Sequence, residues 1–438
     1  MSNKPLGVGM VGLGTVGRGV AALLRDEATL YAERCGRGVE LRRVCVRDVD
    51  KAKASGAVDA GIVTDTIDDL LDDDGIDVVV EVAGGVDPVG GFVERALKAG
   101  KHVVTANKTL LAERGAALFA LAREHGVCIA FEASCGGGIP CVTALTQGLM
   151  ANQIDGLYGI LNGTCNYILT EMTRGGKSYA DALAEAQAAG FAEADPKADV
   201  SGADAAQKLA VLASLAFGVR LTGEQVPTTG IEQLSPGDIA AAGELGYDIK
   251  LLASAERWPG QRWVNAEVRP CFVKKDELLA QVRGAYNALS VHGHAVGHVL
   301  LYGQGAGQLP TASAVIADVI AVANGSAPMA FLNMRLTPDF AQPAALVDPA
   351  DTESAYYLRM ETVDRPGVMA QVTRLLGDRG ISLSAVLQHE SRSGEVVSLV
   401  VTTHTARRGD VQDAAQAIAQ LEAIQAEPVV IRVMELPG

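Results

Sequence analysis

The chain has 438 residues, which suits two or three domains, and it is 48% hydrophobic and 20% charged, as expected for a water-soluble globular protein. Its net charge of −15 argues against nucleic acid or an anionic membrane surface as a partner. No apolar run reaches the roughly 20 residues that span a bilayer, and no secretory signal precedes the first strand. We therefore expect a cytoplasmic protein, with its seven scattered cysteines reduced.

The segment LGVGMVGLGTVGRGVAALLRDE begins the first predicted domain with a short apolar strand, a glycine turn and a helix. Gly12, Gly14 and Gly17 form the pattern G-x-G-x-x-G, which also contains Thr15 and Val16. These glycines allow a tight turn, a close approach of backbone to a pyrophosphate, and close packing of the helix on the strand. The pyrophosphate would lie at the helix N-terminus. The pattern predicts a dinucleotide cofactor, and the alternative is an ordinary glycine-rich turn.

The next predicted strand, VELRRVCV, ends at Arg47 and Asp48. A carboxylate at this position binds the ribose 2′-hydroxyl of NAD, whereas an arginine pairs with the 2′-phosphate of NADP. The sequence offers both residues, so both cofactors stay open. We favour NADP because Arg47 comes first after the strand. The alternative is that both residues are ordinary surface charges.

Strands and helices continue to alternate through GIDVVVEVAGG, HVVTANK and VCIAF. This alternation predicts a doubly wound parallel sheet, in which ligands bind beyond the carboxyl ends of the strands. Six residues fall at such ends: Gly84, Gly85, Thr105, Asn107, Lys108 and Glu132. We expect Gly84, Gly85, Thr105 and Lys108 to contact the cofactor.

Lys108 allows two interpretations. A lysine after a strand is usually a solvated surface charge. Lys108, however, follows an apolar run at a place where a bound nicotinamide would lie. A desolvated lysine there would have a lowered pKa and could exchange a proton with an alcohol.

A dense acidic segment, FAEADPKADVSGADAAQKLAVLASLAFG, leads into a helix predicted from about Gly202 to Phe217. Asp204 and Lys208 are four residues apart and share one face of it. Asp204 could merely form a capping box with Ser201, or the pair could be an ordinary exposed ion pair. The rest of the helix is almost entirely apolar, and a charged pair at the mouth of a buried helix favours a functional role.

Residues 134–140, SCGGGIP, place three glycines in a row shortly after Glu132. Ordering such a run is costly in conformational entropy. The stretch therefore predicts either that the backbone passes close to another group or that its carbonyl groups act as ligands. Gly305 and Gly307 form a second glycine loop between a strand and a helix, and its plain alternative is a tight turn.

The C-terminal part has a different pattern. Residues 336–353, rich in Pro, Ala and Asp, predict a linker. Residues 354–438 show the order strand, helix, strand, strand, helix, strand, which is ferredoxin-like. A D-R-P-G turn at residues 364–367 precedes the first helix of this region. Backbone N–H groups at that helix start can hold a carboxylate.

Three motifs follow GLGTVG in the order ANKTLLA, LNGTCNYIL and GFAEADPKADVSGADAAQKL. In this order they resemble homoserine dehydrogenase, and the resemblance covers essentially the whole chain. The D-R-P-G region resembles an ACT domain. The resemblance implies an α/β architecture: a Rossmann-type NAD(P)-binding domain over 1–132 with a return segment 306–335, an α+β substrate and dimerisation domain over 133–305, and a regulatory ACT domain over 354–438.

The resemblance also implies a reaction, the oxidation of L-homoserine to L-aspartate 4-semialdehyde with NAD(P)+, whose reverse leads towards threonine and methionine. Lys208 and Lys108 match the two active-site lysines of the family. A second ammonium group nearby would help to lower the pKa of the lysine that acts as base. The positions matching the family's substrate contacts are Glu193, Asp204, Asp199 and Thr164, and Gly307 matches a cofactor contact. Cys165 replaces the usual second threonine of the NGTTNY motif, which we interpret as a local packing change.

Two further ligands follow from the resemblance. A monovalent cation, usually sodium, would be held largely by backbone carbonyls of Glu132, Cys135, Gly137 and Ile139, and oxygen ligands suit such a hard cation. The ACT domain would bind threonine as a feedback inhibitor, the alternative being that it only mediates oligomerisation. The family is commonly dimeric, so we expect a homodimer or a homotetramer.

Two competing functions are weighed against this one. A non-catalytic amino-acid sensor predicts that lysines or acids are missing from the central motif, yet all are present. Another NAD(P)-dependent reductase of amino-acid biosynthesis would keep the fold, and the stretch ADPKADVSGADAAQK argues against it.

Overall fold

The computed structural model describes residues 4–258, 263–333, 345–388 and 395–437. The chain divides into two compact units, each built from three separate stretches of sequence. Unit 1 comprises Met1–Gly163, Ala203–Pro227 and Tyr286–Ala344, and unit 2 comprises Thr164–Gly202, Thr228–Ala285 and Ala345–Gly438.

A six-stranded parallel sheet is the centre of the nucleotide-binding part of unit 1. In sheet order its strands are β3 (Val63–Thr64), β2 (Val39–Cys45), β1 (Leu6–Val11), β4 (Val78–Glu81), β5 (His102–Thr105) and β6 (Ile129–Ala130). Strands β1 and β4 are buried along their whole lengths, which explains their nearly continuous apolar sequences. The order reverses between β1 and β4, and doubly wound sheets bind ligands at such a point. The predicted doubly wound sheet is confirmed.

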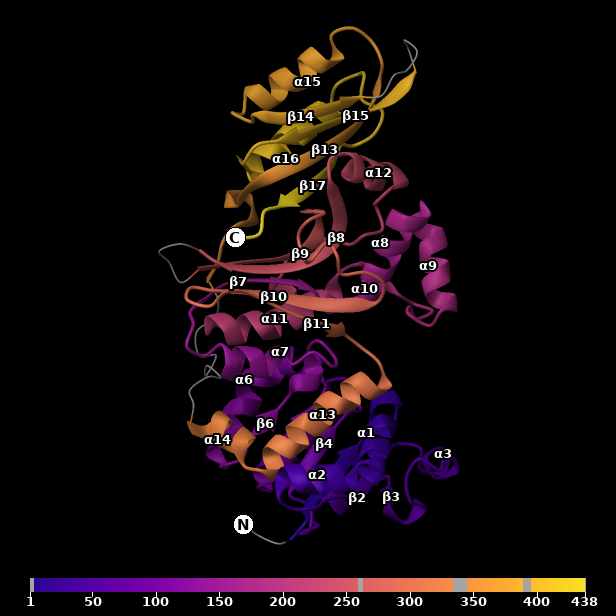
Figure 1. Ribbon diagram of the computed structural model, residues 1–438, viewed down its shortest axis with the longest axis vertical. Helices are drawn as coiled ribbons and strands as arrows, with labels where there is room; N and C mark the ends of the chain where they lie inside the picture. Colours follow the sequence, from indigo (N-terminus) through magenta and orange to yellow (C-terminus); the bar gives the residue numbers. More distant parts are fainter. Residues whose placement is uncertain (1–3, 259–262, 334–344, 389–394, 438) are drawn as a thin grey trace. The chain divides into compact units, whose positions relative to one another are not determined.

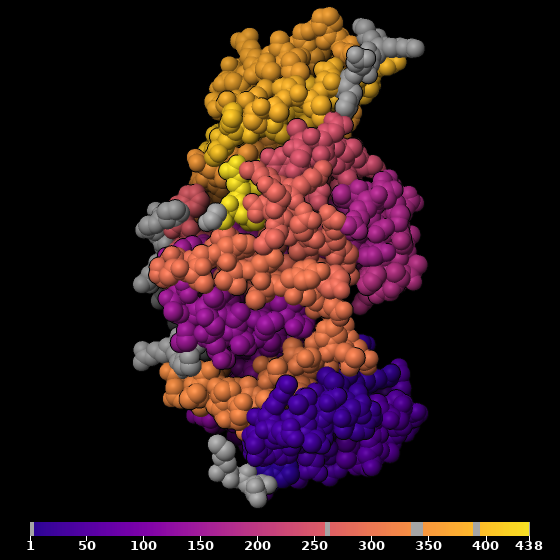
Figure 2. Space-filling model, in the orientation of Figure 1, coloured from indigo at the N-terminus to yellow at the C-terminus, as the bar shows by residue number. Residues whose placement is uncertain are grey.

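Helices from two distant parts of the sequence accompany this sheet. They are α1 (Thr15–Asp26), α2 (Ala28–Cys35), α3 (Val49–Ala54), α4 (Asp68–Leu71), α5 (Val89–Lys98), α6 (Lys108–Glu124), α13 (Gln308–Ala323) and α14 (Ser326–Asn333), with the short turn η1 (Ala60–Ile62). Helix α13 packs tightly on α1. A Cβ at Gly19 would lie only 2.8 Å from the Gln308 carbonyl oxygen, so the glycine permits this packing. Figure 1 shows α13 beside α1 and near β4, and Figure 2 shows the orange surface of this late segment against the indigo surface of the first residues.

The rest of unit 1 is a three-stranded antiparallel sheet in the order β11 (Gly297–Gln304), β10 (Tyr286–Gly293), β7 (Ile154–Ile160), with short helices and one long helix. The helical elements are η2 (Glu132–Ser134), α7 (Cys141–Thr143), η3 (Ala144–Gly148), α11 (Ala203–Phe217) and η4 (Gly223–Gln225). Helix α11 contacts α6 and β7, and most of its apolar second half is buried. The buried helix predicted from the sequence is therefore present.

Unit 2 begins with helices and a long hairpin. The helices are α8 (Gly163–Gly175), whose first residue ends the first stretch of unit 1, α9 (Tyr179–Ala188), α10 (Lys197–Val200) and α12 (Pro236–Glu244). Strands β8 (Tyr247–Arg257) and β9 (Trp263–Lys274) pair in antiparallel fashion. Helix α12 starts with a capping box between Ser235 and Asp238 and has proline at its first position, which is the arrangement that satisfies the free N–H groups of a helix start.

The C-terminal part of unit 2 is ferredoxin-like, as predicted. Its elements are β13 (Glu353–Val363), α15 (Val368–Gly377), β14 (Leu383–Gln388), β15 (Val396–Thr403), β16 (Ala406–Arg407), α16 (Arg408–Ala419) and β17 (Val429–Met434). The sheet order is β17-β13-β15-β14 with antiparallel neighbours. Both helices cover a core that includes Leu358, Val372 and Ile418. Strand β17 also pairs in parallel with β9, so this sheet continues into the hairpin.

Residues 336–344 of the predicted linker and the last two residues of the predicted return segment, 334–335, lie outside the described residues. The rest of the predicted linker forms short secondary structure: β12 (Ala345–Leu346) pairs with β9, and η5 (Pro349–Asp351) follows. Within the described residues no single helix is long and apolar enough to cross a membrane, and α13 with α14 reach that length only across a break bent by 79°. All seven cysteines lie within the described residues, where they are buried and form no disulfide.

Candidate active site

The glycine loop between β1 and α1 has the geometry of a pyrophosphate cradle. Gly12 has a φ of 100°, which favours glycine, and a Cβ there would lie 2.9 Å from the backbone of Ala83. A Cβ at Gly17 would lie 2.4 Å from the Gly12 carbonyl oxygen, so α1 packs closely on the end of β1. Gly14 faces open space and leaves the start of α1 without a side-chain cap. The uncapped helix N-terminus beside this space fits a phosphate group.

Arg47 and Asp48 follow β2 and differ in their surroundings. The Asp48 carboxylate caps α3 by accepting a hydrogen bond from the Lys51 amide at 2.9 Å. Arg47 is exposed and makes no hydrogen bond or ion pair with any described residue. Its guanidinium is therefore available to a phosphate group, the partner that its planar fork matches.

Glu81, at the end of β4, holds the loop that follows it. This fully buried carboxylate accepts hydrogen bonds from the amides of Ala83 and Gly84, both at 2.9 Å, and from the Thr105 hydroxyl at 2.6 Å. Thr105, predicted to contact the cofactor, thus uses its hydroxyl to tie β5 to β4. The role of Glu81 cannot be predicted from the sequence, because a carboxylate in an apolar strand gives no sign of which amides it will satisfy.

Asn107 connects the crevice to the start of α6. Its Nδ2 donates to the Gly85 carbonyl at 2.6 Å, and its Oδ1 accepts from the Leu110 amide at 3.1 Å as the helix cap. Lys108 is the next residue and the first of α6. One side chain therefore fixes both the glycine loop after β4 and the position from which Lys108 extends.

Lys108, Asp204 and Lys208 meet within unit 1. Asp204 Oδ1 lies 3.0 Å from Lys108 Nζ, and Asp204 Oδ2 lies 2.7 Å from Lys208 Nζ. Lys208 also donates to the Leu161 carbonyl at 2.8 Å, and Asn162 Nδ2 donates to Asp204 Oδ2 at 2.9 Å. The side chains of Asp204 and Lys208 are 12% and 13% exposed, and that of Lys108 is 31% exposed. Two lysines from different helices therefore converge on one carboxylate.

The electrostatics of this lysine–aspartate cluster centre on Asp204. Burial alone would raise the pKa of Asp204, but the ammonium groups of Lys208 and Lys108 outweigh burial and hold the pKa well below its usual range. Asp204 is therefore ionised at any physiological pH. Asp204 lies between the two lysines and therefore offsets the repulsion between their ammonium groups. The interpretation of the sequence relied on that repulsion to prepare one lysine as the base.

Neither of the plainer interpretations of Asp204 and Lys208 holds. The pair is largely buried, so it is not an exposed surface pair. Asp204 lies in the first turn of α11, but its carboxylate contacts Lys108, Lys208 and Asn162, so it does not merely serve the helix start. Asn162 was missed, although it belongs to the quoted motif LNGT, because only its contact with Asp204 reveals its role.

The comparisons with known proteins agree with this geometry. The family described as "Homoserine dehydrogenase" matches residues 140–320, its NAD binding domain matches residues 12–132, and the ACT domain matches residues 356–423. A homoserine dehydrogenase of Pseudomonas aeruginosa is 44% identical over 99% of this chain and 100% of its own. The chain belongs to the homoserine dehydrogenase family.

Solved structures of homoserine dehydrogenases share the fold. One from Thiobacillus denitrificans is 42% identical, covers 99% of both chains and superposes with a TM-score of 0.91. A hyperthermophilic archaeal homoserine dehydrogenase mutant in complex with NADPH is 26% identical, with a TM-score of 0.62 over 72% of this chain and 97% of that chain. The chain is accordingly an oxidoreductase with an NAD(P)-binding domain and an ACT domain, as predicted.

The other substrate residues expected from the family, Thr164, Glu193 and Asp199, belong to unit 2. The Thr164 hydroxyl donates to the Phe191 carbonyl at 2.6 Å and lies 3.2 Å from Asp199 Oδ2. Glu193 is exposed, and its carboxylate makes no hydrogen bond or ion pair with the described part of the chain. The Cys165 thiol is buried and contacts the Asp199 carbonyl at 3.2 Å. The roles of these residues stay predictions.

Two of the three consecutive glycines, Gly137 and Gly138, pack against the second glycine loop and the start of α13. A Cβ at Gly137 would lie 2.5 Å from the backbone of Gly305, and a Cβ at Gly138 would lie 3.1 Å from Pro310. The Gly138 amide donates to the Gln304 carbonyl at 3.1 Å. The first of the two explanations predicted for this stretch therefore holds, since backbone passes close to backbone. Gly307, with a φ of 125°, precedes α13 as its N-cap residue.

Glu132 uses its carboxylate within the protein. The carboxylate accepts hydrogen bonds from the amides of Val142 and Thr143 at 2.8 and 2.7 Å, at the start of α7. The Glu132 amide donates to Asp318 at 2.8 Å, and burial raises the pKa of both acids. A cation bound here would therefore meet the backbone carbonyl of Glu132 rather than its side chain.

The predicted cation site has no cluster of side-chain ligands. No group of three or more His, Cys, Asp or Glu residues that could hold a metal occurs in the part of the chain that the structure describes. Burial raises the pKa of the Cys135 thiol to about 11, so the thiol is neutral in the metal-free chain. The sodium site at Glu132, Cys135, Gly137 and Ile139 would depend on backbone carbonyls, and it stays a prediction.

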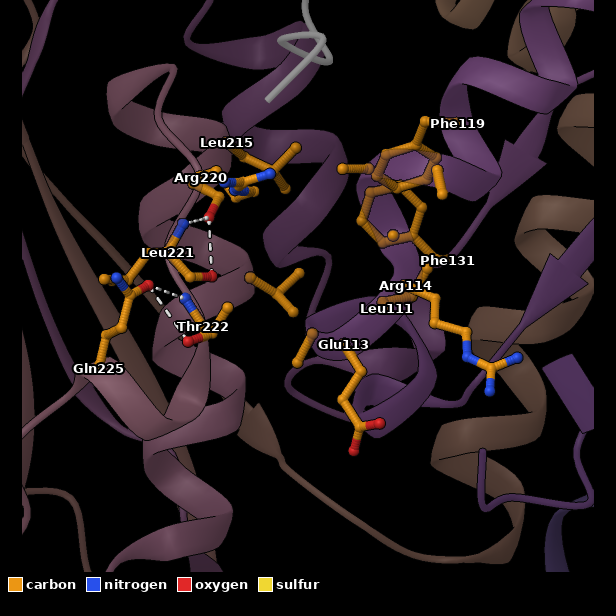
Figure 3. Close-up of a pocket in the computed structure, with 16 residues that line it drawn as sticks. Leu111, Glu113, Arg114, Phe119, Phe131, Leu215, Arg220, Leu221, Thr222 and Gln225 are labelled. Carbon is orange, nitrogen blue, oxygen red and sulfur yellow. Dashed lines mark hydrogen bonds between the residues drawn. The ribbon is translucent and has the colours of Figure 1, made fainter. Parts of the chain in front are cut away.

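A cavity of about 490 Å³ opens further along the two lysine-bearing helices. Figure 3 shows Phe119, Phe131 and Leu111 on one side of it and Leu215 and Leu221 on the other. Neither lysine of the cluster nor Asp204 lines it. Most of its lining comes from α6, α11 and residues 220–225, with Phe131 directly after β6, so it lies further along the helices whose first turns meet at the cluster.

A smaller cavity of about 400 Å³ lies at the D-R-P-G turn in unit 2. Its lining includes Asp364, Arg365 and Gly367, together with Gln388 from β14. Gly367 has a φ of 92° and is the N-cap residue of α15, where no side chain caps the helix. The free amides at this helix start can bind a carboxylate, as the sequence predicted for the ACT ligand.

Proposed function

We propose that the chain interconverts L-homoserine and L-aspartate 4-semialdehyde with NADP(H) as the preferred cofactor, working in the reductive direction on the route to threonine and methionine. The observation that supports the catalytic part is the convergence of Lys108 and Lys208 on Asp204, at 3.0 and 2.7 Å. Membership of the family supports the choice of substrate.

The chain's own groups would manage the proton. A bound nicotinamide supplies the hydride acceptor for oxidation and the hydride donor for reduction. During oxidation, Lys208 Nζ takes the hydroxyl proton as the C–O bond becomes a carbonyl, and during reduction it returns that proton to the new alkoxide. Asp204 positions Lys208. Lys108 lies close enough to the same carboxylate to take part in the proton transfer as well. Thr164, Glu193 and Asp199 would hold the amino-acid end of the substrate, through charge-assisted bonds to its ammonium group.

A direct assay tests this proposal. Reduction of NADP+ and NAD+ is followed spectrophotometrically with L-homoserine as substrate, from neutral to alkaline pH. We expect activity with both cofactors, faster with NADP+, and a rate that rises with pH because only a deprotonated lysine can accept the proton. Absence of activity with L-homoserine at every pH would contradict the assignment and would favour the alternative of another reductase.

The preference for NADP depends on Arg47, which is exposed and without a partner among the described residues. Arg47→Ala should raise KM for NADP+ by about tenfold, the value of one charged hydrogen bond, and leave KM for NAD+ unchanged. Asp48→Asn is the matched control, because the structure uses Asp48 to cap α3. An equal effect of Arg47→Ala on both cofactors would contradict a contact with the 2′-phosphate.

Threonine is the proposed ligand of the ACT domain at the D-R-P-G turn. Deleting residues 354–438 is a poor test, because β17 pairs with β9 and its removal would expose that edge. Asp364→Asn changes the turn alone. We expect threonine to inhibit the wild-type enzyme and to inhibit this variant less, with unchanged activity in its absence. Wild-type activity that is insensitive to threonine would favour a purely oligomeric role for the domain.

Sodium is the remaining proposed ligand, at the carbonyls of Glu132, Cys135, Gly137 and Ile139. Replacing sodium by tetramethylammonium at constant ionic strength should lower kcat, because the loop that would hold the ion packs on the segment leading to α13. Equal rates in both salts would contradict the site. A homodimer or homotetramer in the cytoplasm, without nucleic acid or membrane partners, completes the proposal, and light scattering of the purified chain checks its oligomeric state.

A further inference from the structure

A second cavity in unit 2, of about 380 Å³, lies away from the D-R-P-G turn. Helix α16 contributes Gln412 and Gln416 to its lining, and strands β9 and β13 contribute Arg269 and Tyr356. Arg408, the first residue of α16, lines the cavity as well. No residue of the lysine–aspartate cluster or of the D-R-P-G turn takes part.

Arginines dominate the buried charge beside this cavity. Glu267 Oε2 lies 2.9 Å from Arg408 Nη1 and 3.6 Å from Arg269 Nη1, and Glu267 Oε1 lies 2.8 Å from Arg432 Nη1. Arg432 also lies 3.4 Å from Glu256. Three guanidinium groups thus face two carboxylates, which leaves one positive charge without a counterion among these five residues. An unbalanced buried charge is strongly disfavoured unless an anion accompanies it.

Two of the arginines have unused hydrogen-bond donors. Nε and Nη1 of Arg269 and Nε of Arg408 have no hydrogen-bond partner in the described chain. The side chain of Arg269 is only 10% exposed, and that of Arg408 is 14% exposed. Buried donors are almost always satisfied in proteins, so the guanidinium groups of Arg269 and Arg408, which line the cavity, keep hydrogen-bonding capacity that the described chain does not use. A guanidinium fork matches a carboxylate or a phosphate group.

We propose that this cavity is a binding site for a small organic anion, held through its carboxylate or phosphate group by Arg269 and Arg408. The amides of Gln412 and Gln416 and the hydroxyl of Tyr356 supply polar contacts for the rest of the ligand, and Val411 supplies an apolar one. The volume lies in the range of small-molecule sites. This site is separate from the proposed threonine site and does not depend on it.

Calorimetric titration of the full-length protein tests the proposal. Inorganic phosphate and acetate are titrated separately at constant ionic strength, with NADPH saturating the nucleotide site so that the glycine loop cannot take the phosphate. We expect one saturable site per chain for at least one of the two probes. Saturation by phosphate alone would identify phosphate-bearing ligands, and saturation by acetate alone would identify carboxylates.

Variants locate the site. Arg269→Gln should weaken binding by about tenfold or more, the effect of losing a charged hydrogen-bond donor. Gln412→Glu should weaken it similarly by placing a negative charge at the cavity from an exposed helix position, where misfolding is not expected. Gln420→Glu, at the C-cap of the same helix but outside the cavity, and Arg365→Gln, at the D-R-P-G turn, should bind like the wild type.

Three results would overturn the proposal. The wild-type chain shows no saturable binding of either probe, or Arg269→Gln and Gln412→Glu both bind as tightly as Gln420→Glu, or Arg365→Gln alone abolishes binding. The last result would place the anion at the D-R-P-G turn instead.

Discussion

Each unit contains one largely buried carboxylate surrounded by cations, but the cations differ. In unit 1 the lysine–aspartate cluster places Asp204 between two lysines, and in unit 2 Glu267 lies among Arg269, Arg408 and Arg432. In both cases burial alone would raise the pKa of the acid, and the neighbouring cations outweigh it and lower the pKa. Lysine can release its proton inside a protein, whereas arginine cannot.

This difference separates chemistry from recognition. A lysine beside an ionised carboxylate can exchange a proton with a substrate, provided that one side of the cluster is open, and Lys108 is 31% exposed. Arginines can only present a fixed positive charge, and those around Glu267 are at most 14% exposed. The type of cation and the open side, rather than the presence of a buried ion pair, indicate what each cluster does.

Lys208→Met should break the chemistry of the first cluster and leave the fold intact. We expect kcat for L-homoserine oxidation to fall by about a thousandfold, within the range of general acid–base contributions. The free energy of unfolding should fall by about 2 kcal/mol, as for Asp204→Asn, because buried Asp204 then has only Lys108 as a counterion. Lys98→Met, an exposed lysine of α5, is the control for loss of one charge and should keep wild-type rates. Near-native rates for Lys208→Met would show that Lys208 does not carry the proton.

Arg432→Met should lower stability and leave the chemistry intact. It leaves Glu267 with fewer cations in a buried place, so we expect the free energy of unfolding in urea to fall by about 3 kcal/mol, while kcat stays within twofold of wild type. Arg374→Met removes an exposed pair with Asp378 and should cost about 0.5 kcal/mol or less. A loss of activity without a loss of stability in Arg432→Met would contradict the division of roles between the clusters.

Asp204→Asn sharpens the comparison through pH. The folded chain holds the pKa of Asp204 below its unfolded value of about 3.9, so its stabilisation is complete above that value and is lost as pH falls through the folded pKa. We expect the variant to be less stable by about 2 kcal/mol from pH 8 to about pH 5, and the difference to shrink only in stronger acid. Urea unfolding across pH measures this, with the exposed Asp276→Asn as control. A gap that closes already near neutral pH would show that Asp204 is not held ionised by the lysines.

Asn162→Ala should have the smallest effect. It removes one hydrogen bond to Asp204 at 2.9 Å, worth about 1 kcal/mol, and we expect kcat to fall by about fivefold because Asp204 then holds Lys208 less firmly. Gln207→Ala, in the same turn of α11 but bonded to Thr109 instead, should leave kcat unchanged. If both variants have equal kcat, Asn162 does not position the cluster.

The sequence predicted those features that depend on neighbours in the chain. The roles of Gly12 and Gly17 follow from a strand–turn–helix unit, and the structure shows the close approaches that they permit. Asp204 and Lys208 share a face because the helical period places residues four apart together. Lys108 could also be predicted from the sequence, since a residue at the carboxyl end of a parallel strand lies at the ligand-binding edge.

The missed features depend on contacts between distant segments. Nothing local shows that Glu81 satisfies two loop amides, or that Asn162 reaches Asp204. The sequence indicated a close approach at Gly137 but not that Gly305 is the partner. Glu267 and Arg269 are two residues apart on one face of β9, a pattern that any strand could show. Only β17 and α16, which bring Arg432 and Arg408 to Glu267, complete the charged site.

The meeting of Gly137 with Gly305 has a consequence for variation in this chain. A methyl group at position 137 would force apart two backbone segments, and one of them leads directly into α13. In a library containing every amino acid at this position, only glycine should survive selection for folded enzyme, although no side chain is present there to touch a substrate. Intolerance to substitution at this position would then reflect close packing of two backbone segments rather than a contact with the substrate.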